Sequence, residues 1–250
     1  MTLNKPSLSG YALKTIAVTA MVIDHAAYLF TDAASPLGVV LHFIGRLTAP
    51  IMCYFVAEGY FYTRDFKRYA LRLLSFAVVS QIPYQLVIDK GAVLFPPPGL
   101  NMLFTLLCGL LALRAWNTIQ NDTLRRAAVC GLMLLTSFMD WSIFGVLFVF
   151  VFGIYRGDKK AQYKSFALVA GGYLLMRLFV VLSQPDQLVT VLSALGVFFV
   201  IPLLLLYNGR RGGEWAGTLG KQARWLFYIA YPAHLLLLGV GYRMFLLGRN

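Results

Sequence analysis

The stretch IDHAAYLFTDAASPLGVVLHFIGR, residues 23–46, contains two apolar runs joined by the short turn TDAASP. A turn this short makes two helices antiparallel neighbours. The apolar runs nevertheless carry Asp24, His25, His42 and Arg46. Ionisable side chains in hydrocarbon-length segments are costly, and they normally face a bundle interior or a water-filled cavity. The stretch therefore predicts a helical hairpin with a functional polar site.

The whole chain has the composition of a membrane protein. Of its 250 residues, 59% are hydrophobic and 13% are charged, and the mean hydropathy is +0.71. Apolar runs of about 20 residues, each long enough to cross a bilayer, recur along the chain. We expect an all-α, polytopic integral membrane helical bundle, one domain over residues 1–250. About nine transmembrane helices are predicted, at 11–30, 37–62, 70–88, 100–116, 124–138, 142–156, 163–182, 188–207 and 224–246. The segment 124–156 can form two spans or a re-entrant pair.

The basic residues predict the orientation. Most of the 22 Lys and Arg residues fall in alternate connections, including RDFKR (64–68) and RGDKKAQYK (156–164). The positive-inside rule then places the N-terminus in the cytoplasm, and it explains the net charge of +12 without a nucleic-acid partner. Nothing before residue 11 resembles a cleavable leader, so the first apolar segment is expected to be retained. The three cysteines have no metal-ligand spacing, and no metal is predicted.

The hairpin geometry places its polar groups at a common depth. His25 and His42 are nearly equidistant from the turn, roughly 8 Å below the outer helix ends at 1.5 Å per residue. Arg46 follows His42 by four residues and shares its helical face. Asp24 is rotated about 100° from His25, so we expect it to pair with Arg46 across the hairpin.

Other polar residues fall in the same half of the predicted bundle. The candidates for substrate contact are Gln81, Asn101, Asp140, Arg177 and His234. Each also has a structural interpretation. Arg177 can be an ion-pair partner, Asn101 and Gln81 can bridge helices, Asp140 can mark the membrane interface, and His234 can bond a backbone carbonyl.

The cytoplasmic side carries candidates for binding an anionic cofactor, namely Arg210, Arg211, Lys221 and Glu58. Basic side chains suit phosphate groups. Topology alone also explains the basic residues, and an ordinary ion pair with Arg64 or Lys67 also explains Glu58.

Several motifs together resemble the TraX family. They are LKTIAVTAMVIDH (13–25), GRLTAPIMCYFVAEGYFYTRD (45–65), RLLSFAVVSQIPY (72–84), NMLFTLLCGLLAL (101–113), DWSIFGVLFVFVF (140–152), YNGRRG (207–212) and WLFYIAYPAHLLLL (225–238). The resemblance implies a bacterial inner-membrane acetyltransferase, whose named member acetylates the pilin N-terminus with acetyl-CoA. It also suggests a distant similarity to membrane acyltransferases that modify cell-surface polymers. The family commonly has Asp-Tyr-Gly where this chain has Asp140, Trp141 and Ser142.

These observations lead us to expect transfer of an acetyl group from cytoplasmic acetyl-CoA to an acceptor at the outer face. The acceptor is an amine, such as the pilin N-terminus, or a hydroxyl of a cell-surface glycan or polymer. His25 is the expected general base and Arg46 the expected oxyanion donor. Asp24 is expected to aim the guanidinium, and His42 to relay protons. A covalent acetyl-histidine intermediate is an alternative to direct transfer.

Two other functions use the same residues. A proton-coupled transporter or flippase would use the buried histidines and carboxylates as a proton relay. Matched broken helices or internal repeats, which are typical of inverted-repeat transporters, are not evident in the sequence. An assembly scaffold for a secretion machine would need neither activity.

Overall fold

The computed structural model describes residues 7–182, 184, 188–212 and 218–248, and for residues 218–224 it describes the backbone alone. This part of the chain is all-helical, with two isolated backbone bridges and no strand. The elements are α1 (Gly10–Phe30), α2 (Pro36–Gly45), α3 (Thr48–Tyr62), α4 (Phe66–Ile88), α5 (Met102–Thr118), α6 (Asp122–Leu135), the 3-10 helix η1 (Thr136–Phe138), α7 (Ser142–Ile154), α8 (Lys159–Leu182), α9 (Thr190–Ala194), the 3-10 helix η3 (Leu195–Phe199), α10 (Val200–Leu205) and α11 (Thr218–Leu247).

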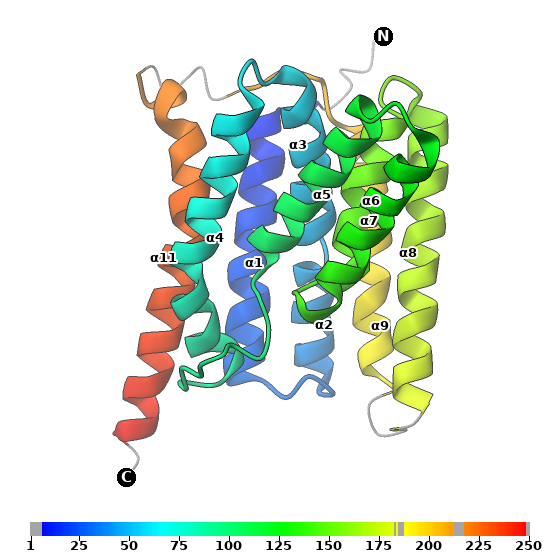
Figure 1. Cartoon of the computed structure of the whole chain (residues 1–250). Coiled ribbons are helices and arrows are strands. Elements are labelled where there is room, and N and C mark those ends of the chain that lie inside the picture. The colour runs from blue at the N-terminus through cyan, green and yellow to red at the C-terminus, as the bar shows by residue number, and fades with distance from the viewer. Residues whose placement is uncertain (1–6, 183, 185–187, 213–217, 249–250) are drawn as a thin grey trace, which may run out of the picture.

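The helices run roughly antiparallel in one bundle, and their connections gather at two ends (Figure 1). One end carries the start of α1 and the connections α3–α4, α5–α6 and α7–α8. Residues 206–212 join this end, because the backbone N–H groups of Leu8 and Gly10 donate to Leu206 and Arg210. We call it the basic end, since it holds the predicted cytoplasmic connections. The α1–α2 and α4–α5 connections lie at the other end, as the alternating pattern predicted.

Five helical segments among the described residues are long and apolar enough to cross a membrane: Gly10–Phe30, Pro36–Tyr62, Phe66–Ile88, Lys159–Leu182 and Trp225–Leu247. This finding supports a multi-pass membrane protein. Helices also occur at the other four predicted places, but they are shorter. The 13 residues of α7 rise only about 20 Å, against roughly 30 Å of hydrocarbon. Nine membrane spans are therefore not confirmed.

The start of α5, the end of α6 and the start of α7 meet inside the bundle and not at its end (Figure 1). Leu100 donates its N–H to Phe138 O (3.1 Å), and Asp140 donates its N–H to Leu100 O (2.8 Å). The Thr105 hydroxyl donates to Asp140 O at 2.7 Å. These bonds satisfy backbone groups that water cannot reach at this depth. The α6–α7 turn therefore lies inside the bundle, which favours the re-entrant alternative for 124–156 and brings Asp140 into the interior.

Asn101 and Gln81 hold the start of α5 against α4. Asn101 is fully buried and caps α5, because its Oδ1 accepts from Leu103 N–H at 3.1 Å. Its Nδ2 donates to Ala77 O (2.8 Å) and to Gln81 Oε1 (2.9 Å). Gln81 Nε2 donates to Gly99 O at 2.8 Å. Both residues thus have the helix-bridging role that the sequence offered as an alternative to substrate contact.

The second predicted span, 37–62, is interrupted where α2 ends at Gly45 and α3 begins at Thr48. Gly45 allows a close approach to α1, because a Cβ there would lie 2.2 Å from Asp24 Oδ1. Gly196 of η3 approaches α2 from the other side, where a Cβ would lie 2.1 Å from Phe43 O. The interruption therefore lies between two close helix contacts, next to Arg46.

Candidate functional site

A cavity of about 190 Å³, which we call the chamber, lies where α1, the α2–α3 break, the α6–α7 turn and α11 meet. Its polar lining residues are Asp24, His25, Tyr28, Arg46, Thr48, Asp140 and Tyr231. Three of the four residues predicted from the hairpin for catalysis therefore line one cavity. The fourth, His42, does not line the chamber.

His42 lies behind Asp24 and pairs with it. The distance from His42 Nδ1 to Asp24 Oδ1 is 2.8 Å, and the imidazole is buried. A carboxylate only accepts hydrogen bonds, so His42 Nδ1 carries the proton. The expected Asp24–Arg46 pair is wrong. Gly45 lets α2 pack so closely on α1 that Asp24 meets His42, whereas the Arg46 guanidinium lies 5.6 Å from the Trp141 ring centroid.

His25 contacts a histidine from the far end of the chain. Its Nδ1 lies 3.0 Å from His234 Nε2, and His234 Nδ1 lies 2.8 Å from Ala230 O. A carbonyl can only accept, so the Nδ1 of neutral His234 holds its proton and its Nε2 accepts from His25 Nδ1–H. Neutral His25 is then left with a lone pair on Nε2, as a general base requires. His234 therefore positions His25, in addition to the carbonyl bond that the sequence suggested.

The chamber also holds a guanidinium and a carboxyl group. Arg46 Nε is buried and has no hydrogen-bond partner among the described residues. The Asp140 carboxyl forms no ion pair with any described residue, although it lies against the backbone N–H of Trp141. Tyr173 hydrogen-bonds another part of the Arg46 guanidinium. Unsatisfied buried polar groups are costly, so Arg46 Nε can still bind a ligand in the chamber.

A second cavity of about 380 Å³, which we call the vestibule, is lined by α1, α3, α4, α5, α11 and the segment after α10. Its wall contains the basic residues Lys14, Arg64, Arg72 and Arg211 and no acidic residue. None of these four forms an ion pair within the described part of the chain. Arg72 Nε is buried without a hydrogen-bond partner there. A concave surface with cations alone favours an anionic ligand.

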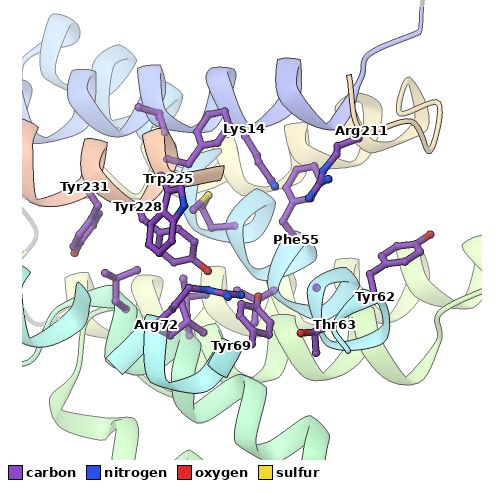
Figure 2. A pocket seen from close by; sticks show the side chains of 18 of the residues that line it. Lys14, Phe55, Tyr62, Thr63, Tyr69, Arg72, Arg211, Trp225, Tyr228 and Tyr231 are labelled. Atoms are coloured by element: carbon purple, nitrogen blue, oxygen red, sulfur yellow. The ribbon is translucent and has the colours of Figure 1, made fainter. Parts of the chain in front are cut away.

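Aromatic and aliphatic side chains make up most of the remaining vestibule wall (Figure 2). Lys14 Nζ lies 4.7 Å from the Phe55 ring centroid, and Arg72 Cζ lies 5.6 Å from that of Tyr69. The vestibule extends from Tyr62 and Thr63, at the basic end, to Met21 and Tyr231. Met21 and Tyr231 also line the chamber, so the two cavities abut.

The residues predicted for an anionic cofactor are separated by the structure. Arg211 lines the vestibule. Arg210 is exposed outside it, and its backbone N–H donates to Asn208 Oδ1. Glu58 pairs with Arg156 at 2.8 Å, and not with Arg64 or Lys67. The side chain of Lys221 lies outside the described residues.

Among the residues predicted for substrate contact, only Asp140 lines the chamber. Gln81, Asn101 and Arg177 line neither cavity. Sequence reasoning missed Lys14, Arg72 and Tyr231. Lys14 carried a signal, because it precedes His25 by 11 residues, about three helical turns on one face of α1.

The long apolar helices define a multi-pass helical membrane protein, and the buried polar chamber and the basic vestibule are its candidate functional site. The chain belongs to the TraX family, because the family model described as TraX protein matches residues 9–241. The predicted family is thereby confirmed. The chain is 34% identical over 235 residues to a Dichelobacter nodosus protein described as "Probable fimbrial assembly protein FimC, serogroup H1". The match covers 92% of this chain and 94% of the relative. No solved structure matches the chain.

Proposed function

We propose that this protein transfers an acetyl group from acetyl-CoA to an acceptor in the bacterial inner membrane. One observation carries the proposal: the vestibule and the chamber, which holds His25, abut at Met21 and Tyr231. A donor with a charged nucleotide and a slender acyl arm needs two such cavities in contact. The positive-inside rule places the basic end in the cytoplasm, and the cytoplasm is the compartment that contains acetyl-CoA.

The vestibule suits the nucleotide part of acetyl-CoA. The phosphates carry several negative charges, and Lys14, Arg72 and Arg211 line the wall without ion-pair partners in the described chain. Charge-assisted hydrogen bonds to phosphate are stronger than neutral ones. The adenine ring can stack on aromatic side chains such as Trp225. The thioester end of the arm would then reach the junction of the two cavities.

The chamber suits the transfer step. An acceptor amine attacks the thioester carbon and gives its proton to His25 Nε2, and the Arg46 guanidinium binds the oxyanion that forms. The C–S bond then breaks, and the proton passes from His25 to the thiolate. The products are the acetylated acceptor and CoA with a free thiol. His234 and His42 hold His25 and Asp24 in place through 3.0 Å and 2.8 Å contacts.

Two features bear on the acceptor. The relative is described as a fimbrial assembly protein, which supports a pilin N-terminus as the amine. The Asp140 carboxyl, without an ion-pair partner among the described residues, can hold a protonated amine before it loses its proton. A hydroxyl of a cell-surface glycan would gain less from this carboxylate.

The test uses the purified protein in nanodiscs with acetyl-labelled acetyl-CoA, a pilin N-terminal peptide and a surface polysaccharide. We expect label on the peptide, and a loss of about 10²–10⁴-fold in the His25→Asn variant because the base is removed. Lys164→Ala, on an exposed part of α8, should keep the activity. Full activity of His25→Asn would rule out the proposed base.

The second candidate is a proton-coupled transporter. The His25–His234 contact and the Asp24–His42 pair favour it, because chains of such groups conduct protons. Proteoliposomes separate the two functions. Substrate uptake driven by a proton gradient, without acetyl transfer, would favour the transporter.

A further inference from the structure

Tyr231 occupies the junction of the two cavities. Its side chain lines both the vestibule and the chamber, and Met21 is the other residue that the two cavities share. Figure 2 shows Tyr231 at the end of the vestibule that lies opposite Tyr62 and Arg211. A ligand that passes from the basic end toward His25 therefore passes Tyr231.

The hydroxyl of Tyr231 has no partner to donate to. The residue is only 7% exposed. Its hydroxyl oxygen faces the backbone N–H of Met102 without a hydrogen bond of normal geometry, and its proton has no acceptor among the described residues. Burying a hydroxyl without an acceptor costs about 1–3 kcal/mol. A ligand oxygen at the junction would remove this cost.

The two residues shared by the cavities, Met21 and Tyr231, each lie one helical turn from a histidine of the His25–His234 pair. Met21 and His25 are four residues apart on α1, and Tyr231 and His234 are three residues apart on α11, so each pair shares a helix face. The Tyr231 ring lies 5.8 Å from the His234 ring, which contacts His25. Trp225 and Tyr228 continue the same face of α11 into the vestibule. Tyr231 thus lies beside both the donor's expected path and the His25–His234 pair.

We infer that Tyr231 is a catalytic residue whose hydroxyl donates a hydrogen bond to the carbonyl oxygen of the bound thioester. The inference rests on the proposed function. The bond orients the carbonyl carbon toward the nucleophile and strengthens as negative charge develops on the oxygen. Arg46 supplies the second donor from the chamber side. Tyr231 keeps its proton throughout, because the acceptor's proton travels by way of His25 to the leaving sulfur.

The experiment compares wild type, Tyr231→Phe and Tyr242→Phe in nanodiscs with labelled acetyl-CoA. The phenylalanine keeps the ring, so the variant changes only the hydroxyl. We expect kcat to fall about 100-fold in Tyr231→Phe, with KM for acetyl-CoA changed less than about threefold, since the bond matters most in the transition state. Tyr242, on the same helix but outside both cavities, is the matched control and should keep wild-type kcat.

A second measurement reads the bond itself. Acetyl-CoA with a ¹³C carbonyl is bound to the His25→Asn variant, which lacks the base, and the infrared carbonyl band is compared with that of the His25→Asn, Tyr231→Phe double variant. We expect a lower wavenumber when the hydroxyl is present. Equal bands and an unchanged kcat in Tyr231→Phe, with an active wild type, would overturn this inference alone. Absence of any transfer by wild type would overturn the proposed function and this inference with it.

Discussion

Asp24 owes its position to a neighbouring glycine. A Cβ at Gly45 would lie 2.2 Å from Asp24 Oδ1, so alanine there must push α1 and α2 apart. We expect Gly45→Ala to destabilise the protein by about 1–3 kcal/mol and to reduce acetyl transfer, because the Asp24–His42 bond lengthens. Gly131→Ala is the control, since nothing lies within 4 Å of a Cβ at that position of α6. Thermal unfolding in nanodiscs should show a lower Tm for the first variant alone, and equal values would contradict the packing argument.

Arg46 and Arg72 are expected to act at different stages of the reaction. Arg46→Lys should lower kcat by about 10–100-fold with little change in KM, because a point charge replaces a planar fork at the oxyanion. Arg72→Lys, in the vestibule, should raise KM for acetyl-CoA and leave kcat nearly unchanged. Steady-state kinetics with varied acetyl-CoA distinguishes the two effects. If Arg46→Lys raised KM and left kcat unchanged, Arg46 would not be the residue that stabilises the transition state.

For single residues, the sequence predicted which side chains line the chamber better than it predicted their hydrogen-bond partners. The cost of ionisable groups in apolar segments selected Asp24, His25 and Arg46, and the structure brings these three to the wall of one cavity. The His25–His234 contact joins residues 209 positions apart, and hairpin geometry contains no information on it. The Asp24–Arg46 prediction failed because the approach of α2 to α1 depends on Gly45, which a helical wheel does not show.

The start of α5 depends on a buried amide. Asn101 caps this helix and also binds Gln81 and Ala77 of α4. We expect Asn101→Ala to cost about 2–4 kcal/mol, because the cap is lost and buried acceptors on α4 lose their donor. Asn121→Ala is the control, since Asn121 caps α6 at an exposed site with one bond to Leu124 N–H. It should cost only about 1 kcal/mol. Chemical denaturation in mild detergent measures both, and equal losses would argue against the bridging role.

The positions of the helices along the sequence were predictable, whereas the depth at which α5, α6 and α7 meet inside the bundle was not. Apolar runs located helices in all nine predicted places. The sequence left 124–156, which includes the 14 residues of α6, open as two spans or a re-entrant pair, because hydropathy reports an apolar environment and not the position of a helix end. The turn between α6 and α7 lies inside the bundle because Leu100 bonds Phe138 and Asp140. Such backbone pairing depends on no particular side chain, so it leaves no pattern in the sequence.

The two cavities lie at different distances from the basic end of the molecule. The vestibule begins at the basic end, and the chamber lies deeper, beside the α6–α7 turn. In the proposed reaction, the two cavities would let a charged donor and a separate acceptor approach His25 from different directions. This division depends on the α6–α7 turn, because Asp140 and Trp141 form one wall of the chamber.

Cysteine labelling in cells tests that architecture. In a background with Cys53, Cys108 and Cys130 replaced by alanine, single cysteines are placed at Ala33, Gln120 and Phe138. We expect a membrane-impermeant maleimide to label Ala33→Cys from outside the inner membrane, because residue 33 lies in the α1–α2 connection. Gln120→Cys, in the α5–α6 connection at the basic end, should react only after the membrane is opened. Phe138 is 79% exposed on the protein surface, but a turn at bilayer depth faces lipid, where the thiolate that reacts does not form. Phe138→Cys should therefore resist labelling on both sides, whereas two complete spans over 124–156 would make it react from outside, like Ala33→Cys.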